Sequence, residues 1–287
     1  MTAEKIFKNP KNLKRRKFIN SLMIFLCFVA AVLTILPLLY IFIYTTQSGI
    51  SALNIDFFTQ LPKPVGEEGG GMANAIVGSG ILIGLGGLIG IPIGIMSGIY
   101  IAEYSKSFLA GAIKFTTDVL SGVPSIVVGI FAYGVVVLAM QSFSAIAGGF
   151  ALGILMIPTV TKITEEMLRL VPHSLREASL ALGVSRWKTT VKVVLKTASS
   201  GIITGVLLAI ARAAGETAPL LFTAFGNSFW QTSIDQPIAA LPLQIFVYAI
   251  SPYEDWHRQA WAGAFVLIFM VFIVNFLVRY VTRNKFG

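Results

Sequence analysis

The chain has 287 residues, of which 55% are hydrophobic and only 12% are charged, with a formal net charge of +9. Soluble domains carry about 25% charged residues, and a membrane span needs roughly 20 apolar residues. The apolar residues here come in runs of that length, so we exclude a large soluble domain and predict an all-α, polytopic membrane protein. The basic residues form no single amphipathic patch, so the positive charge does not indicate a nucleic-acid partner.

Six apolar segments are long enough to cross the bilayer. The cytoplasmic N-terminal tail, residues 1–18, is basic, and the apolar run after it is too long for the core of a signal peptide and lacks a small-residue cleavage site. The apolar piece Ile238–Ile250 has 13 residues and is too short to cross. We therefore expect a transmembrane domain at 19–283, with spans at about 19–44, 73–101, 115–138, 145–163, 198–222 and 261–280.

Six spans place both termini on one side of the membrane, and the basic residues indicate which side. With the termini inside, Lys63 and Arg258 lie in outer loops and Arg212 lies within a span, which leaves 19 of the 22 basic residues inside. Because cytoplasmic loops carry the excess of Lys and Arg, we expect cytoplasmic termini in a cell membrane. The charged segment 164–197 is then a cytoplasmic loop.

The second expected span carries a glycine every four residues. This spacing places a bare stripe on one helix face, where another helix can approach closely. General loosening of a membrane helix is the alternative, because glycine is common in such helices. The sequence leaves open whether the stripe packs within the chain or against another chain. The four residues are Gly86, Gly90, Gly94 and Gly98.

The third expected span begins with an acidic residue and contains a punctuated run. Asp118 lies within about a turn of the interface, where a carboxylate is favourable at a helix start or serves a function. Ser121, Pro124 and Ser125 belong to the run SGVPS that follows it. We treat these four residues as possible functional residues.

The loop 164–197 has the pattern of two short helices. Ser174 and Glu177 fit a capping box, Gly183 fits the position after the helix end, and Ser185 fits the N-cap of a second, basic helix. Two interpretations follow from this pattern. The helices lie on anionic lipid, or they dock into a partner protein.

Recognisable catalytic motifs are absent from the sequence. There is no P-loop and no HExxH motif, Cys27 is the single cysteine, and His173 and His257 are far apart. Glu165 and Glu166 are expected at a solvated helix end. We therefore predict that the chain is not an enzyme and needs no metal or cofactor.

The fifth expected span contains two opposite charges. Arg212 and Glu216 are four residues apart, so on a helix they share a face and can pair. An ionisable group at membrane depth costs at least about 2.5–3.5 kcal/mol. A self-neutralising structural pair is one interpretation. The other is an anion path, since the planar guanidinium suits oxyanions, with the hydroxyl of Thr217 beside it.

A resemblance strengthens the docking interpretation. Glu177-Ala178-Ser179, then Gly183, then Val193-x-Leu195 resembles the EAA loop of ABC importer permeases. Ser179 replaces an alanine of that consensus and Lys196 replaces a proline. In that family the loop docks on a cytosolic ATPase subunit, which implies a coupling role for Glu177, Ala178, Gly183, Ser185, Arg186 and Trp187.

Longer runs resemble the phosphate permeases of the Pst system, and its PstA type in particular. The resemblance implies a type I, MetI-like bundle that translocates phosphate by alternating access and an ATP-hydrolysing subunit that is separate. It also implies a PstC-type permease paralogue as heterodimer partner, a PstB-type ATPase dimer and a PstS-type phosphate-binding protein. The runs are GGGMANAIVGSG, IPIGIMSGIYIAEY, TDVLSGVPSIVVGIFAYG, REASLALGVSRW and AIARAAGETAPLLFTA.

Three alternatives remain at this stage. The chain is a permease for another oxyanion such as sulfate or molybdate, or an autonomous channel or secondary transporter, or a structural scaffold. An autonomous transporter predicts inverted repeats, and the sequence has no convincing repeat. A scaffold leaves Arg212 and Glu216 unexplained.

Overall fold

A computed structural model describes residues 10–67 and 69–283, and its regular structure is helical apart from one isolated bridge between Phe225 and Ile238. The first nine residues of the expected basic tail, Glu68 and residues 284–287 lie outside the described residues. The chain divides into two units, Met1–Ser48 and Gly49–Gly287. The first unit consists mainly of α2 (Pro10–Gly49), a helix with Pro37 inside it.

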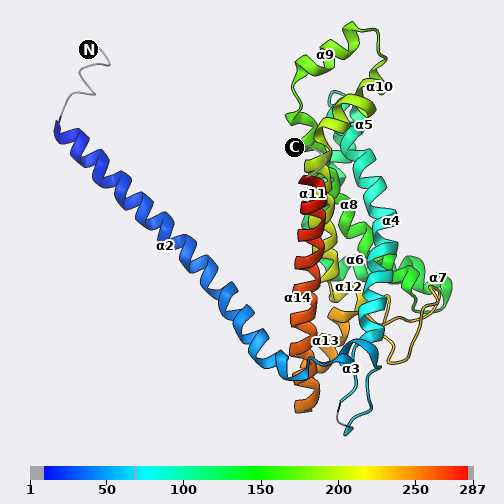
Figure 1. The fold of residues 1–287 in the computed structure, drawn as a ribbon. Helices are drawn as coiled ribbons and strands as arrows, with labels where there is room; N and C mark the ends of the chain where they lie inside the picture. Colours follow the sequence, from blue (N-terminus) through cyan, green and yellow to red (C-terminus); the bar gives the residue numbers. More distant parts are fainter. Residues whose placement is uncertain (1–9, 68, 284–287) are drawn as a thin grey trace. The chain divides into compact units, whose positions relative to one another are not determined.

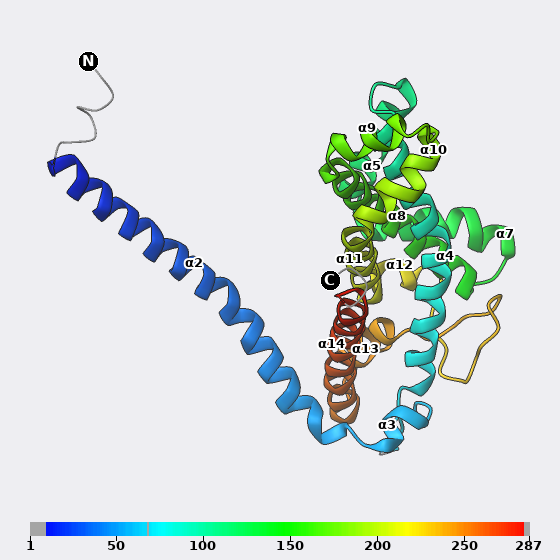
Figure 2. The same ribbon diagram turned by 45° about the horizontal axis from the view of Figure 1, so that its top comes forward.

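The second unit is organised around α8 (Ala145–Leu170). This helix packs against α4 (Ala73–Glu103) on one side and α11 (Leu195–Ala214) on another, and α4 and α8 run side by side in both views of the fold (Figures 1 and 2). Apolar side chains of these helices form the main core, because each helix buries its contact face against α8. Buried members of that core include Leu82, Leu152, Met156, Val160, Ala209 and Leu220.

The glycine stripe of α4 lies against α8. A methyl group added at Gly90 would lie 2.7 Å from the carbonyl oxygen of Gly153, and one added at Gly94 would lie 2.6 Å from Cβ of Val160. At Gly84, on the same helix, it would meet nothing within 4 Å. The contact is therefore inside this chain's own bundle. It brings the two backbones closer together than they could lie if α4 had a side chain larger than hydrogen at these positions. All four stripe residues are buried: Gly86, Gly90, Gly94 and Gly98.

The segment expected as one span at 115–138 is instead two helices bent by 106°. α5 (Phe108–Gly122) ends before Pro124, and α6 (Ser125–Ala132) starts after it. Proline restricts the residue before it to extended backbone, and Val123 has ψ of 129°. After α6 the chain continues through the π-helical turn η2 (Tyr133–Val137) and α7 (Leu138–Met140).

Two further expected boundaries differ in the structure. α8 extends to Leu170, seven residues beyond the expected end at 163, so its last two turns are part of the bundle. The fifth expected span, 198–222, is also interrupted. α11 ends at Ala214, and a short helix α12 (Ala218–Leu221) follows after a break.

Two groups of short elements lie at the two ends of the second unit. One end, here called the elbow end, carries α9 (His173–Ala181), α10 (Arg186–Thr189) and the π-helical turn η3 (Thr190–Val194), which runs into α11. The elbow is the segment from α9 to η3. The opposite end, here called the α13 end, carries η1 (Ile50–Ala52), α3 (Ile55–Thr59) and α13 (Leu241–Ala249) (Figures 1 and 2). The last helix is α14 (Glu254–Arg283).

Within the described residues, five helices are long and apolar enough to cross a membrane, or six if the bent pair counts as one span. These are the helices that contain α2, α4, α8, α11 and α14, with α5 to α7 as the bent pair. The fold is therefore an all-helical multi-pass membrane bundle.

Candidate functional site

The predicted pair Arg212–Glu216 lies across the end of α11. Arg212 occupies the last turn of the helix, and Glu216 follows the break at Gly215, with Nε and Oε1 3.7 Å apart. The sequence predicted that the two residues share one continuous helix face. In the structure the pair instead joins the end of a helix to the break after it. The Arg212 side chain is 59% exposed and that of Glu216 only 16% exposed.

This exposure decides what the pair can do. Among the described residues, the guanidinium has one ion-pair contact, at 3.7 Å, which keeps most of its five donors available to an oxyanion. Because Arg212 is on a membrane-spanning helix, its exposed fork must face water, another protein or an anion. Thr217 lies in the break, half-buried, beside Glu216.

The structure brings a second helix break close to this one. Gly129 of α6 packs against Pro219 of α12, where an added methyl group would lie 2.6 Å from the proline Cα. The break at Pro124 is about one turn before Gly129. Of the run SGVPS, Ser121 and Pro124 are exposed, and the Ser121 hydroxyl donates to the Thr117 carbonyl at 2.8 Å. Ser125 begins α6 and is half-buried.

Asp118 belongs to a separate cluster of charges near the elbow end. Its carboxylate lies 2.9 Å from Nζ of Lys162 on α8, which fastens α5 to α8. Glu165, expected at a solvated helix end, is instead only 7% exposed, because α8 continues past it. It lies 2.7 Å from Arg169 and 3.6 Å from Lys114.

The sequence analysis did not predict this cluster, although the i,i+4 spacing of Glu165 and Arg169 indicates a helical ion pair. The groups line a cavity of about 320 Å³ with Thr117 and Glu166. Its lining has three cations and three carboxylates, and two of its ion pairs join α5 to α8, so we interpret it as a fastening between these helices.

The elbow end presents the six predicted coupling residues on its surface. Gly183 has φ of +76°, a left-handed conformation that favours glycine, directly after the end of α9. Ser185 is the N-cap of α10, without a side-chain capping bond. The predicted capping box is wrong, because α9 begins at His173 with Pro172 as its N-cap. All six residues are exposed: Glu177, Ala178, Gly183, Ser185, Arg186 and Trp187.

Two contacts hold the elbow in place. Arg176 forms an ion pair with Glu103 at the end of α4 and donates to the Leu168 carbonyl at 2.9 Å. The hydroxyls of Ser179 and Thr189 are buried and 2.9 Å apart, which joins α9 to α10. A cavity of about 590 Å³ lies between the elbow and the end of α4, lined by Glu103, Arg169, Arg176, Glu177 and Arg186 among others.

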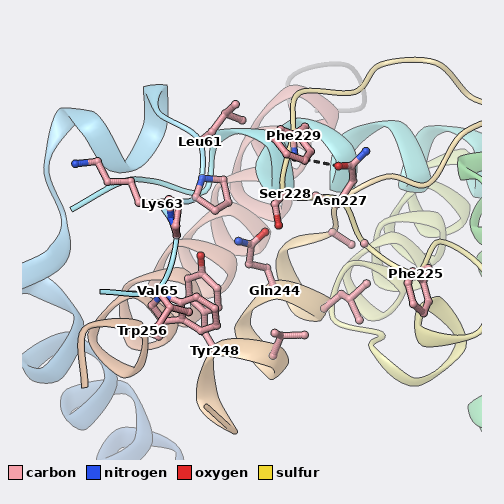
Figure 3. A pocket seen from close by; sticks show the side chains of 17 residues that line it. Leu61, Lys63, Val65, Phe225, Asn227, Ser228, Phe229, Gln244, Tyr248 and Trp256 are labelled. Atoms are coloured by element: carbon pink, nitrogen blue, oxygen red, sulfur yellow. Dashed lines mark hydrogen bonds between the residues drawn. The ribbon is translucent and has the colours of Figure 1, made fainter. Parts of the chain in front are cut away.

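A third cavity, of about 530 Å³, opens at the α13 end. It lies between the loop at Leu61–Val65, the loop at Phe225–Phe229 and α13 (Figure 3). Tyr248 stacks on Trp256 with ring centroids 4.4 Å apart. Burial raises the pKa of the Tyr248 phenol, so its hydroxyl stays protonated. The lining is mainly apolar, with the polar ends of Ser228, Gln244 and Tyr248 at its centre (Figure 3).

Within residues 10–67 and 69–283, no three His, Cys, Asp or Glu side chains come together as a group that could hold a metal ion.

Comparisons with known proteins agree with an all-helical membrane bundle and show its family. Residues 90–286 match the family described as "Binding-protein-dependent transport system inner membrane component". Phosphate transport system permease protein PstA of Yersinia pestis is 49% identical over 249 residues, which cover 86% of this chain and 84% of that one. The probable PstA of Methanocaldococcus jannaschii is 37% identical, over 91% of this chain and 93% of its own length.

A solved structure has the same fold at low sequence identity. An inward facing conformation of the MetNI methionine ABC transporter superposes with a TM-score of 0.58 at 16% identity, over 74% of this chain and 96% of the matched chain. The bundle is therefore that of an ABC importer permease, an inner membrane component of a binding-protein-dependent transport system. Within that class, the chain belongs to the PstA family of permeases.

Proposed function

We propose that this chain is the membrane-spanning permease subunit of an ATP-driven importer that carries inorganic phosphate into the cytoplasm. The observation that carries the proposal is Arg212, a guanidinium that is 59% exposed at the end of a membrane-spanning helix. The names of the PstA relatives support phosphate as the anion. A planar, permanently charged group with free donors is suited to that ligand.

In this proposal Glu216 keeps Arg212 partly neutralised until an anion arrives. The 3.7 Å separation supports such a role, because the pair is close enough to interact but longer than a hydrogen-bonded ion pair. Thr217 adds a hydroxyl next to Glu216 in the same break. An oxyanion would then compete with Glu216 for the guanidinium.

The elbow end is the proposed contact for a separate ATPase dimer, of the PstB type, which hydrolyses the ATP. Support comes from its exposed side chains, among them Leu182 at 84% exposed and Trp187 at 64% exposed. Such apolar exposure is typical of a surface that a partner covers. The Arg176–Glu103 ion pair would pass movement of α9 directly to the end of α4.

The remaining partners follow from the same assignment. A PstC-type paralogue completes the anion path, since one chain leaves Arg212 exposed on its own surface. A PstS-type phosphate-binding protein meets the α13 end, which faces out when both termini are cytoplasmic. ATP binding and hydrolysis then alternate access to Arg212 between the two sides of the membrane.

Reconstitution tests this function. The chain is purified with its copurifying permease and ATPase, placed in liposomes with binding protein on one side, and assayed for uptake of radioactive phosphate with and without ATP. We expect uptake only with ATP, only from the complete complex, and without competition from sulfate or molybdate. Uptake by this chain alone without ATP, or uptake of sulfate in preference to phosphate, would contradict the proposal.

A further inference from the structure

Two membrane-spanning helices of the bundle expose stripes of the same spacing but opposite chemistry. On α4 the exposed positions recur every four residues and carry no polar side chain: Gly80, Gly84, Leu88, Pro92 and Met96, of which Leu88 is 75% exposed. On α11 the exposed positions also recur every four residues, but their side chains are mostly polar. In order toward Arg212 they are Lys196, Ser200, Thr204, Leu208 and Arg212.

Lipid is a suitable environment for the first stripe only. Nothing on the α4 stripe needs a polar partner, so acyl chains can cover it at no cost. The α11 stripe has a cation at each end and two hydroxyls between them, and burying these against hydrocarbon is unfavourable. The α11 stripe is therefore suited to a polar environment and not to lipid.

The two hydroxyls of this stripe differ in whether they donate a hydrogen bond within the protein. Thr204 donates to the Ser200 carbonyl at 2.9 Å, which leaves its oxygen exposed but its proton occupied. Among the described residues, the Ser200 hydroxyl has no protein partner, so its proton is available to an anion. Ser200 is thus a donor two turns beyond Leu208.

Leu208 interrupts the polar stripe. Its side chain is 58% exposed and stands one turn from Arg212 and one turn from Thr204, about 6 Å of helix rise in each direction. An anion that moves along this face must pass the isobutyl group. An apolar side chain in a narrow polar path blocks ions, because they lose hydration there without a replacement.

We propose that the exposed face of α11 is the anion's route from Arg212 to the elbow end, with Leu208 as its apolar barrier and Thr204 and Ser200 as the hydroxyls beyond it. The inference rests on the proposed function of Arg212 and adds the residues that follow it. Lys196, at the elbow end of the stripe, attracts the anion once it has passed Leu208.

Cysteine labelling tests the route. Cys27 is the single cysteine, so Cys27→Ser gives a cysteine-free background in which Ser200→Cys, Thr204→Cys and the control Leu88→Cys are introduced. The complete complex in lipid nanodiscs is treated with a negatively charged, membrane-impermeant methanethiosulfonate, without nucleotide and with a non-hydrolysable ATP analogue. In at least one state we expect both α11 cysteines to react at least tenfold faster than Leu88→Cys, and inorganic phosphate to slow that reaction severalfold.

The outcomes separate the route from the substrate. Reaction of Ser200→Cys and Thr204→Cys at the rate of Leu88→Cys in both states would overturn the route. Fast reaction that sulfate slows and phosphate does not would support the route and contradict phosphate as the substrate.

The barrier is tested by passive flux. Leu208→Ser is expected to raise ATP-independent phosphate efflux from proteoliposomes severalfold, while Leu88→Ser, an equal change on the α4 stripe, leaves efflux unchanged. Efflux from Leu208→Ser no greater than that from Leu88→Ser would overturn the barrier. Gel filtration of both complexes confirms that each is assembled.

Discussion

The hydroxyl of Ser179 lies 2.9 Å from that of Thr189, and both residues are buried between α9 and α10. The EAA-like pattern has alanine where this chain has Ser179. The serine provides a hydrogen bond that joins the two halves of the elbow, and alanine has no group that replaces it.

Ser179→Ala should therefore loosen the elbow without unfolding the bundle. It removes one hydrogen bond and leaves the Thr189 hydroxyl buried without a partner, which costs about 1–3 kcal/mol. We expect faster amide hydrogen exchange at 173–189 and a lower transport rate per ATP hydrolysed. Ser174→Ala, at an exposed position of the same helix, is the control, and equal exchange in both variants would contradict the prediction.

The α4–α8 contact should tolerate no side chain larger than hydrogen at the glycine stripe. At Gly90 an added methyl group meets backbone and Met156 Cβ at 2.7–2.8 Å, so Gly90→Ala must push the helices apart, at a cost of about 1–3 kcal/mol. Gly84→Ala, two turns away and facing open space, should be neutral or stabilising. Thermal unfolding in detergent micelles, followed by gel filtration, compares the two variants. Equal midpoints would show that the contact adjusts freely.

The fork of Arg212, and not its charge alone, should be needed for transport. Arg212→Lys keeps the charge but loses the planar, bidentate geometry, so we expect normal assembly and at least a tenfold loss of phosphate uptake. Arg212→Gln should lose uptake completely. Uptake is measured in the reconstituted complex, with ATPase activity as the control for assembly. Full uptake by Arg212→Gln would make the Arg212–Glu216 pair structural.

The two ion pairs between α5 and α8 should contribute differently to the thermal stability of the protein. Glu165 is nearly buried between two cations, and Glu165→Gln leaves both without a counter-charge, which we expect to cost about 1–3 kcal/mol. Asp118 and Lys162 are half-exposed, and water and salt screen such a pair, so Asp118→Asn should change the thermal midpoint far less. A larger effect of Asp118→Asn would assign that residue a role beyond fastening α5.

The sequence alone determined the class of this protein. Long apolar runs and few charges require a helical membrane bundle, since only helices and closed barrels satisfy the backbone in lipid. The four-residue spacing of Gly86 to Gly98 predicted a bare helix face, because helical periodicity places those positions together. The left-handed residue after α9 was likewise predicted from Gly183.

Only the tertiary structure decided where helices break and what the charged groups face. Pro124 and Gly215 indicate weak points, but the 106° bend and the end of α11 before Glu216 depend on packing of α6 against α12. Periodicity also cannot show that Glu165 is buried, because its burial depends on the packing of α5, whose Lys114 lies beside it together with Arg169 of α8 itself. Packing likewise decides which face of α11 is exposed. α8 covers the opposite face and leaves the polar one open, and this depends on contacts between helices and not on one helix alone.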